Sequence, residues 1–225
     1  MIGIDFQRYK IGFLKLYKSK YIFLQKKEML RIGIVLFWIS FSFAQNNEVE
    51  AVYEFQKKMN AEFADADESP LTEEDRVQFK GLDFYPINEK LIVEATFKKA
   101  KKEKPFKMKT STDRTPMYVK FGTLYFELEG KTFQLNVYQN LELSKRHGFK
   151  DYLFLPFSDV TCGKESYIGG RYIDMRIPKT DKVVINFNKA YNPYCAYNHK
   201  YSCPIVPLEN DLNIAIEAGV KKFHD

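Results

Sequence analysis

Short apolar and aromatic segments, separated by turn-forming residues, recur along the chain from Leu82 onward. They are rich in Phe, Tyr, Val and Ile, and Gly, Asn, Pro or charged residues interrupt them. The segments expected to be strands are 91–97, 106–110, 117–121, 123–128, 132–138, 152–157, 172–177, 182–187 and 212–216, with a tight hairpin at Glu129-Gly130-Lys131. Such a pattern, without alternating long helices, predicts a mainly β fold, an antiparallel β-sandwich or barrel-like domain.

Two helices are expected before these strands. In residues 47–65 the apolar side chains are spaced so that they would lie on one face of a helix. They are Val49, Val52, Tyr53, Met59 and Phe63. This spacing predicts an N-terminal amphipathic helix that, with its linker, occupies residues 46–70. Thr72, with Asp75 three positions later, is typical of a helix start, and Phe79 is expected to end that short helix against the core. The β-rich domain is therefore assigned to residues 71–225.

An apolar run near the N-terminus predicts export to the periplasm or the medium. Arg31, an apolar run and the small-x-small end Ser42-Phe43-Ala44 give residues 29–44 the layout of a signal peptide cleaved after Ala44. The run is shorter than the roughly 20 residues that cross a bilayer, so no stable membrane span is expected after signal removal. A retained anchor is the alternative. Residues 1–28 resemble neither a signal nor a domain, and we interpret them as an extended or misassigned start.

The net charge of +6 belongs to this leader. Residues 1–45 carry eight basic and two acidic side chains, so residues 46–225 are neutral. Because binding to nucleic acids depends on neutralising phosphates, no nucleic-acid partner is expected.

All three cysteines lie in the part expected to be exported. An oxidising compartment permits disulfides, and Cys195 and Cys203, eight positions apart around an expected turn, are predicted to pair. The alternative is that these two and Cys162 are small buried apolar residues, because spacing alone does not establish a bridge. A Cys195 nucleophile with His199 is a further alternative. The histidines lack zinc spacing, so neither a metal nor a cofactor is expected.

Residues 156–174 concentrate glycines, hydroxyls and charged side chains between two expected strands. This composition predicts a pocket in which the backbone approaches a ligand closely. The guanidinium fork of Arg171 suits a carboxylate or a phosphate, and Glu165 with Asp159 would form an acid/base pair. The alternative is a β-hairpin with no ligand, in which Arg171 forms ion pairs with neighbouring carboxylates only to balance their charge.

Residues 186–198 form a second cluster, rich in Asn and Tyr. These side chains offer neutral donors and acceptors on rigid bodies, which suits sugars and other uncharged polar ligands. The same residues also order irregular loops, because Asn side chains bond to nearby backbone.

Both clusters carry motifs that resemble a known family. The motifs are Pro156-Phe157-x-Asp159-x-Thr161-x-Gly163-x-Glu165-x-Tyr167-x-Gly169-Gly170-Arg171-Tyr172-x-Asp174 and Asn186-Phe187-Asn188-x-Ala190-Tyr191-Asn192-Pro193-x-Cys195-Ala196-Tyr197, followed by Cys203-Pro204 and Glu209-Asn210. They are similar to the prokaryotic domain of unknown function family 1684, over roughly residues 70–222. The resemblance implies no activity, because none is assigned to the family. The chain departs from it at Cys162, where Ser or Gly is expected, and at Asn186, where Asp is expected.

Together these observations predict an exported domain that binds a small polar or anionic ligand between residues 156–174 and 186–198. The candidate ligand-binding residues are Arg114, Thr161, Tyr167, Arg171, Asp174, Tyr191, Asn192 and Tyr197. One alternative is a hydrolase-like enzyme that uses Glu165 and Asp159 as catalytic residues. The other is a structural or protein-interaction module.

Overall fold

A computed structural model describes residues 47–224, nearly all of which belong to one compact unit, Glu48–Asp225. The expected start (1–28) and signal peptide (29–44) lie outside the described residues. No helix within residues 47–224 is long and apolar enough to cross a bilayer.

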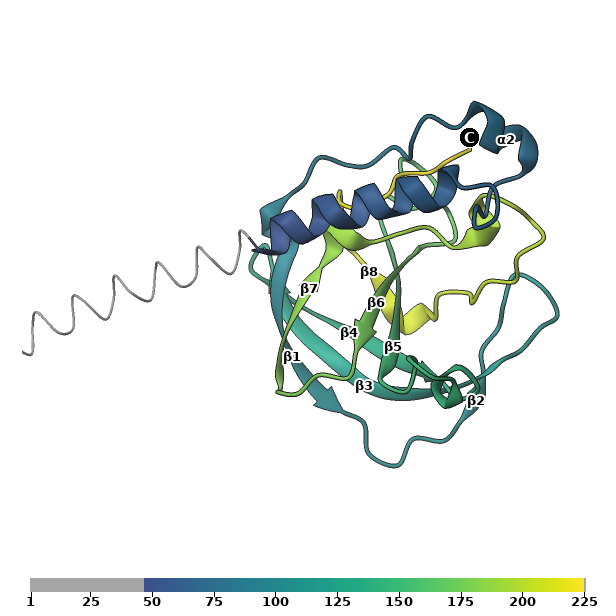
Figure 1. The fold of residues 1–225 in the computed structure, drawn as a ribbon. Coiled ribbons are helices and arrows are strands. Elements are labelled where there is room, and N and C mark those ends of the chain that lie inside the picture. The colour runs from purple at the N-terminus through teal and green to yellow at the C-terminus, as the bar shows by residue number, and fades with distance from the viewer. Residues whose placement is uncertain (1–46, 225) are drawn as a thin grey trace, which may run out of the picture. The chain divides into compact units, whose positions relative to one another are not determined.

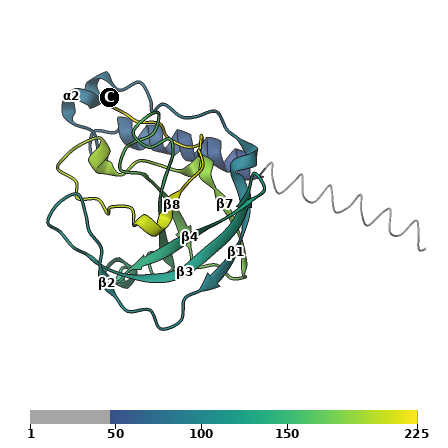
Figure 2. The ribbon, with the colours of Figure 1, turned by 180° about the vertical axis from the view of Figure 1, so that it is seen from behind.

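A single curled sheet forms a half-barrel, which Figures 1 and 2 show from opposite sides. The strands pair in the order β6-β5-β4-β3-β1-β7, and β2 and β8 pair with β3 and β5. Their bounds are β1 (Ile92–Lys99), β2 (Phe106–Lys107), β3 (Met117–Leu128), β4 (Lys131–Asn140), β5 (Tyr152–Asp159), β6 (Arg171–Arg176), β7 (Lys182–Asn186) and β8 (Asp211–Leu212). All pairings are antiparallel except the short β5–β8 contact. The predicted mainly β, antiparallel, barrel-like class is confirmed, with a sheet that closes only half-way.

The two strands expected on either side of Gly122 are one strand, β3, interrupted by a bulge between Lys120 and Gly122. Tyr118 and Leu124 are an even number of positions apart, so a regular strand would place both on one face. The bulge adds one residue to the strand, which reverses the alternation of side chains between the two faces. Leu124 therefore packs in the main core, and Tyr118 packs on the opposite face. Gly122 is required here because a Cβ atom would lie 2.3 Å from the Phe97 ring.

The core face of the sheet packs the main hydrophobic cluster. Alternate residues of the central strands supply it, for example Leu153, Leu155 and Phe157 of β5, all fully buried. Each such side chain contributes roughly 1.5–3 kcal/mol through burial. The expected hairpin at Glu129-Gly130 is confirmed, since Leu128 pairs with Lys131 and both turn residues have positive φ.

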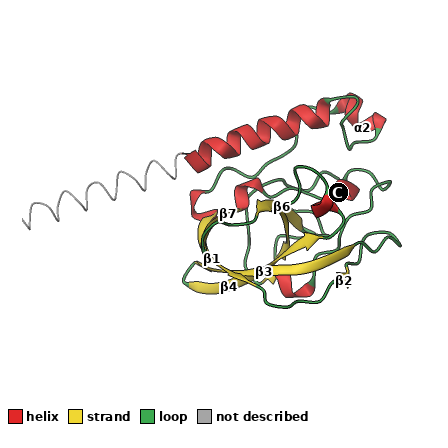
Figure 3. Cartoon of the chain, turned by 60° about the horizontal axis from the view of Figure 1, so that its bottom comes forward, coloured by secondary structure: helices red, strands yellow, loops and turns green. Residues whose placement is uncertain are grey.

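Residues 47–64 are helical, and this helix lies along one side of the half-barrel (Figures 1 and 3). Val52, Met59 and Phe63 are buried. The short helix α2 (Glu73–Gln78) begins as the sequence predicts, because Thr72 accepts a hydrogen bond from the backbone N–H of Asp75.

The segments expected to be strands at 106–110 and 212–216 are mostly irregular. In the first segment only Phe106–Lys107 pair in the sheet, and in the second only Leu212 does, together with the preceding Asp211. The following residues nevertheless contribute buried side chains, among them Met108 and Ile216. The apolar pattern therefore indicates burial in these segments but not strand pairing.

Gly170 and Gly148 give a matched test of close packing, because both have φ of 81°. A Cβ atom at Gly170 would lie 2.6 Å from the carbonyl oxygen of Phe157, whereas one at Gly148 would meet nothing within 4 Å. We expect Gly148→Ala to cost about 1 kcal/mol of unfolding free energy through backbone strain, and Gly170→Ala to cost at least about 3 kcal/mol. Urea unfolding measures both; equal costs would contradict the packing described.

Candidate functional site

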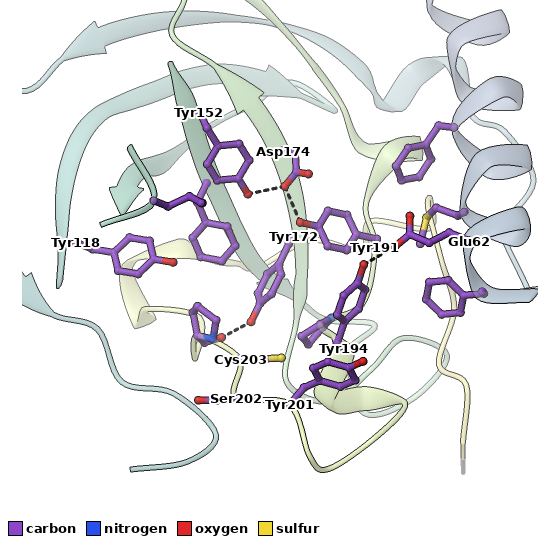
Figure 4. Close-up of a pocket in the computed structure, with 17 residues that line it drawn as sticks. Glu62, Tyr118, Tyr152, Tyr172, Asp174, Tyr191, Tyr194, Tyr201, Ser202 and Cys203 are labelled. Atoms are coloured by element: carbon purple, nitrogen blue, oxygen red, sulfur yellow. Dashed lines mark hydrogen bonds between the residues drawn. The ribbon is translucent and has the colours of Figure 1, made fainter. Parts of the chain in front are cut away.

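A cavity of about 390 Å³ lies between the helix of residues 47–64, strands β3, β5 and β6, and the loop 191–204 (Figure 4). We call it the aromatic pocket. Its rings are Phe55, Phe63, Tyr118, Tyr152, Phe154, Tyr172, Tyr191, Tyr194 and Tyr201. Phe154 and Tyr172 pack edge to face at a centroid distance of 4.6 Å, an arrangement that stabilises aromatic pairs.

Asp174 is held at the wall of this pocket by two tyrosines. The hydroxyls of Tyr152 and Tyr191 donate to its Oδ1 at 2.7 and 2.6 Å (Figure 4). Strand pairing places these groups together, because Phe154 of β5 lies opposite Asp174 of β6 and alternate residues share a face. Burial, reinforced by the Asp174 carboxylate, raises the pKa of both phenols, so both remain neutral donors at neutral pH.

Glu62 supplies a second carboxylate from the helix side. Its Oε1 accepts a hydrogen bond of 2.5 Å from the Tyr194 hydroxyl, whose pKa is raised by burial and by this bond (Figure 4). Within residues 47–224, neither carboxylate has an ion-pair partner, and no Lys, Arg or His lines the pocket. The pocket therefore combines aromatic faces with two acidic groups.

Of the predicted ligand-binding residues, Asp174 and Tyr191 line this pocket. Arg114 lies beside it, where its guanidinium donates to the carbonyl oxygen of Ser202 at 2.8 Å and to the Ser202 hydroxyl at 3.2 Å. The sequence analysis missed Glu62 and Tyr152. The sequence could have indicated Tyr152, because it lies two positions before Phe154 in a predicted strand and so shares its face. Its contact with Asp174 depends on the pairing of β5 with β6, which the sequence does not give.

Arg171 and Asp159, two of the predicted site residues, do not line the aromatic pocket. They form an ion pair of 2.7 Å in which both side chains are completely buried. Arg171 also donates to the carbonyl oxygens of Ile216, at 2.8 Å, and Ala218. Both terminal nitrogens of Arg171 therefore bond inside the protein, whereas its buried Nε has no hydrogen-bond partner among the described residues.

Asp159 and Glu165, the expected acid/base pair, lie in different environments. The Oδ1 atom of Asp159 accepts from Thr161, and its Oδ2 atom accepts from Arg171 and from the backbone N–H of Ile216 at 3.0 Å. Glu165 is exposed to solvent on the following loop. Asp159 and Thr161 therefore belong to the buried network that connects β5, β6 and the C-terminal segment.

A second cavity, of about 600 Å³, lies on the other side of the loop 191–204. Tyr167, Cys195, Tyr197, His199 and His224 are among its lining residues. Tyr197 is nearly fully buried and packs against Phe63 at a centroid distance of 4.8 Å. Asn192 is buried and donates to the carbonyl oxygen of Lys221 at 2.7 Å, so it orders the loop.

The three cysteines are free thiols in the structure. Cys195 and Cys203 nevertheless lie side by side, because the backbone N–H of Cys195 donates to Cys203 Sγ at 3.2 Å. Their disulfide remains a prediction. Within the described residues, no group of three His, Cys, Asp or Glu side chains is placed to hold a metal ion.

The buried ion pair can be compared with an exposed one. Arg171→Met leaves Asp159 buried without its cation, and we expect a loss of about 3–5 kcal/mol of unfolding free energy. Arg176→Met removes the Arg176–Asp151 pair, in which both side chains are more than half exposed, and should cost less than about 1 kcal/mol. Urea unfolding measures both. Similar losses for the two variants would argue against the structural role of Arg171.

Comparison with known proteins places this fold in a family. One similar solved structure is the solution NMR structure of an uncharacterized protein from gene locus rrnAC0354 of Haloarcula marismortui, with 31% sequence identity and a TM-score of 0.62. The match covers 78% of this chain and 95% of that chain. No curated protein matches the chain. The model of a family described as protein of unknown function, DUF1684, matches residues 77–221, inside the range of the resemblance seen in the sequence. The chain therefore belongs to the DUF1684 family.

Proposed function

We propose that this protein binds a small organic cation in the aromatic pocket. The observation that carries the proposal is the placement of Asp174 and Glu62 among tyrosine and phenylalanine rings, without a basic side chain in the pocket lining. The aromatic pocket has a volume of about 390 Å³, which is within the usual range for small-molecule sites.

The aromatic rings and the carboxylates favour the same kind of ligand. A cation over an aromatic face gains about 0.5–2 kcal/mol, with the larger value where water is excluded. Each carboxylate adds a Coulombic attraction that strengthens as the local dielectric constant falls. Because the tyrosine hydroxyls that contact Asp174 and Glu62 are neutral donors, they fix the two carboxylates without cancelling their charge.

This proposal replaces an anionic ligand with a cationic one. An anion in the pocket would be repelled by Asp174 and Glu62. Of its two expected anchors, Arg171 is enclosed in the core, and Arg114 lies beside the pocket, bonded to Ser202. Segments 156–174 and 186–198 still contribute, through Tyr172 and Asp174 from the first and Tyr191 and Tyr194 from the second. Export through residues 29–44 remains part of the proposal, supported by the signal-like sequence.

Choline and its uncharged isostere 3,3-dimethylbutanol test the charge requirement. We expect choline to bind and to raise the melting temperature, because a ligand that binds only the folded state stabilises it. The isostere has the same shape without the charge and should bind more weakly. Asp174→Asn should weaken choline binding by about tenfold, or about 1.4 kcal/mol. Isothermal titration calorimetry measures these affinities.

The asparagine side chain still accepts from both tyrosines, so this variant removes charge while conserving the shape of the pocket. Glu142→Gln is the control, because Glu142 is exposed, pairs only locally with Lys145 and does not line the pocket. Equal affinities for choline and its isostere, or an Asp174→Asn affinity equal to that of Glu142→Gln, would overturn the proposal.

A further inference from the structure

Cys195 and Cys203 form a pair of thiols located between the two cavities. Cys195 lies in the 3-10 helix Tyr194–Ala196 and lines the second cavity. Cys203 lies just before Pro204 and lines the aromatic pocket, where Figure 4 shows its sulfur among the rings. The thiols are mostly buried, with 8% exposure for each residue. Each of the two cysteines therefore borders a different cavity.

Hydrogen bonds favour a thiolate on Cys195. Interaction with the neighbouring Cys203 side chain, and with Ser111 and Tyr167, lowers the pKa of Cys195 to about 6, against burial, which raises it. The same interaction between the two cysteines, followed by burial, raises the pKa of Cys203. The other titratable groups around the pair are Tyr172 on the pocket side and Asp75, Tyr197, His199, Lys222 and His224 around the second cavity.

Cys162 has a different environment. It is half-buried, and its thiol donates to Asp159 Oδ1 at 3.6 Å, in contact with the buried ion pair. Burial raises the pKa of its thiol. A thiolate is the reactive form of cysteine, so Cys162 is an internal control for the other two.

We propose that Cys195 and Cys203 form a thiol–disulfide exchange site, in which Cys195 attacks and Cys203 resolves. The substrate is a small-molecule disulfide. This proposal is independent of the cation-binding function, since it rests on the two sulfurs and their hydrogen bonds rather than on Asp174 or Glu62.

The exchange proceeds in two steps. The Cys195 thiolate attacks one sulfur of the disulfide, so that a mixed disulfide forms and one thiolate leaves and takes up a proton. The Cys203 thiol then loses its proton and attacks the Cys195 sulfur, forming the Cys195–Cys203 disulfide and releasing the second small thiol. The two cysteines lose two electrons and two protons in total, and the small disulfide is reduced to two thiols.

Mass spectrometry of the reduced full chain after treatment with glutathione disulfide tests the proposal. We expect the natural chain to lose two hydrogens and to give a cross-linked peptide containing Cys195 and Cys203. Cys203→Ala removes the resolving thiol and should trap one glutathione on Cys195. Cys162→Ala should behave as the natural chain does.

Alkylation by iodoacetamide at varied pH gives a second readout. Cys195 should react with a midpoint near pH 6, and Cys203→Ala should move this midpoint upward because the main hydrogen-bond donor is lost. A folded Cys203→Ala variant that traps no glutathione would overturn the proposal. So would a Cys195 alkylation rate equal to that of Cys162 at pH 7.

Discussion

The buried ion pair between Arg171 and Asp159 is the interaction on which the rest of the structure depends. A buried charge is costly unless it is paired and hydrogen-bonded, and here every partner comes from a specific element. Asp159 ends β5, Arg171 begins β6, and Ile216 and Ala218 belong to the C-terminal segment. Satisfying the two charges therefore fixes three segments that are far apart in the sequence.

The same strand that buries Arg171 presents the aromatic pocket on its opposite face. Arg171 and Tyr172 are neighbours, and neighbouring strand residues point to opposite sides. Arg171 enters the core with Ile173, whereas Tyr172 and Asp174 face the pocket. The core network thus sets the position of the pocket wall. The loop 191–204 lines the pocket and also contains Cys195 and Cys203. The proposed cation site and the proposed thiol–disulfide exchange site therefore both depend on the position of this loop.

The sequence predicts the fold class and the segments of the site better than it predicts the roles of individual residues. The alternation of apolar and polar residues, together with the turn residues, locates most strands. Burial of one face of a strand places an apolar residue at every second position. The bulge in β3 is not predicted, because Gly122 in the sequence looks like a turn rather than an irregularity within one strand. Residues 156–174 contribute Tyr172 and Asp174 to the aromatic pocket, but the face that Arg171 occupies depends on strand register, which one sequence does not reveal. Glu62 is missed because its partner, Tyr194, is distant in sequence.

The C-terminal segment has a consequence for how the protein is made. The carbonyl groups that accept from Arg171, and the N–H group that donates to Asp159, come from residues 216–218. During synthesis, β5 and β6 are made before these partners exist, so their two charges lack these hydrogen bonds until residues 216–218 follow. The two charges can therefore be enclosed in the core only after residues 216–218 have been made. Folding of β5 and β6 into the core is therefore coupled to residues 216–218, which lie more than 40 positions later in the chain.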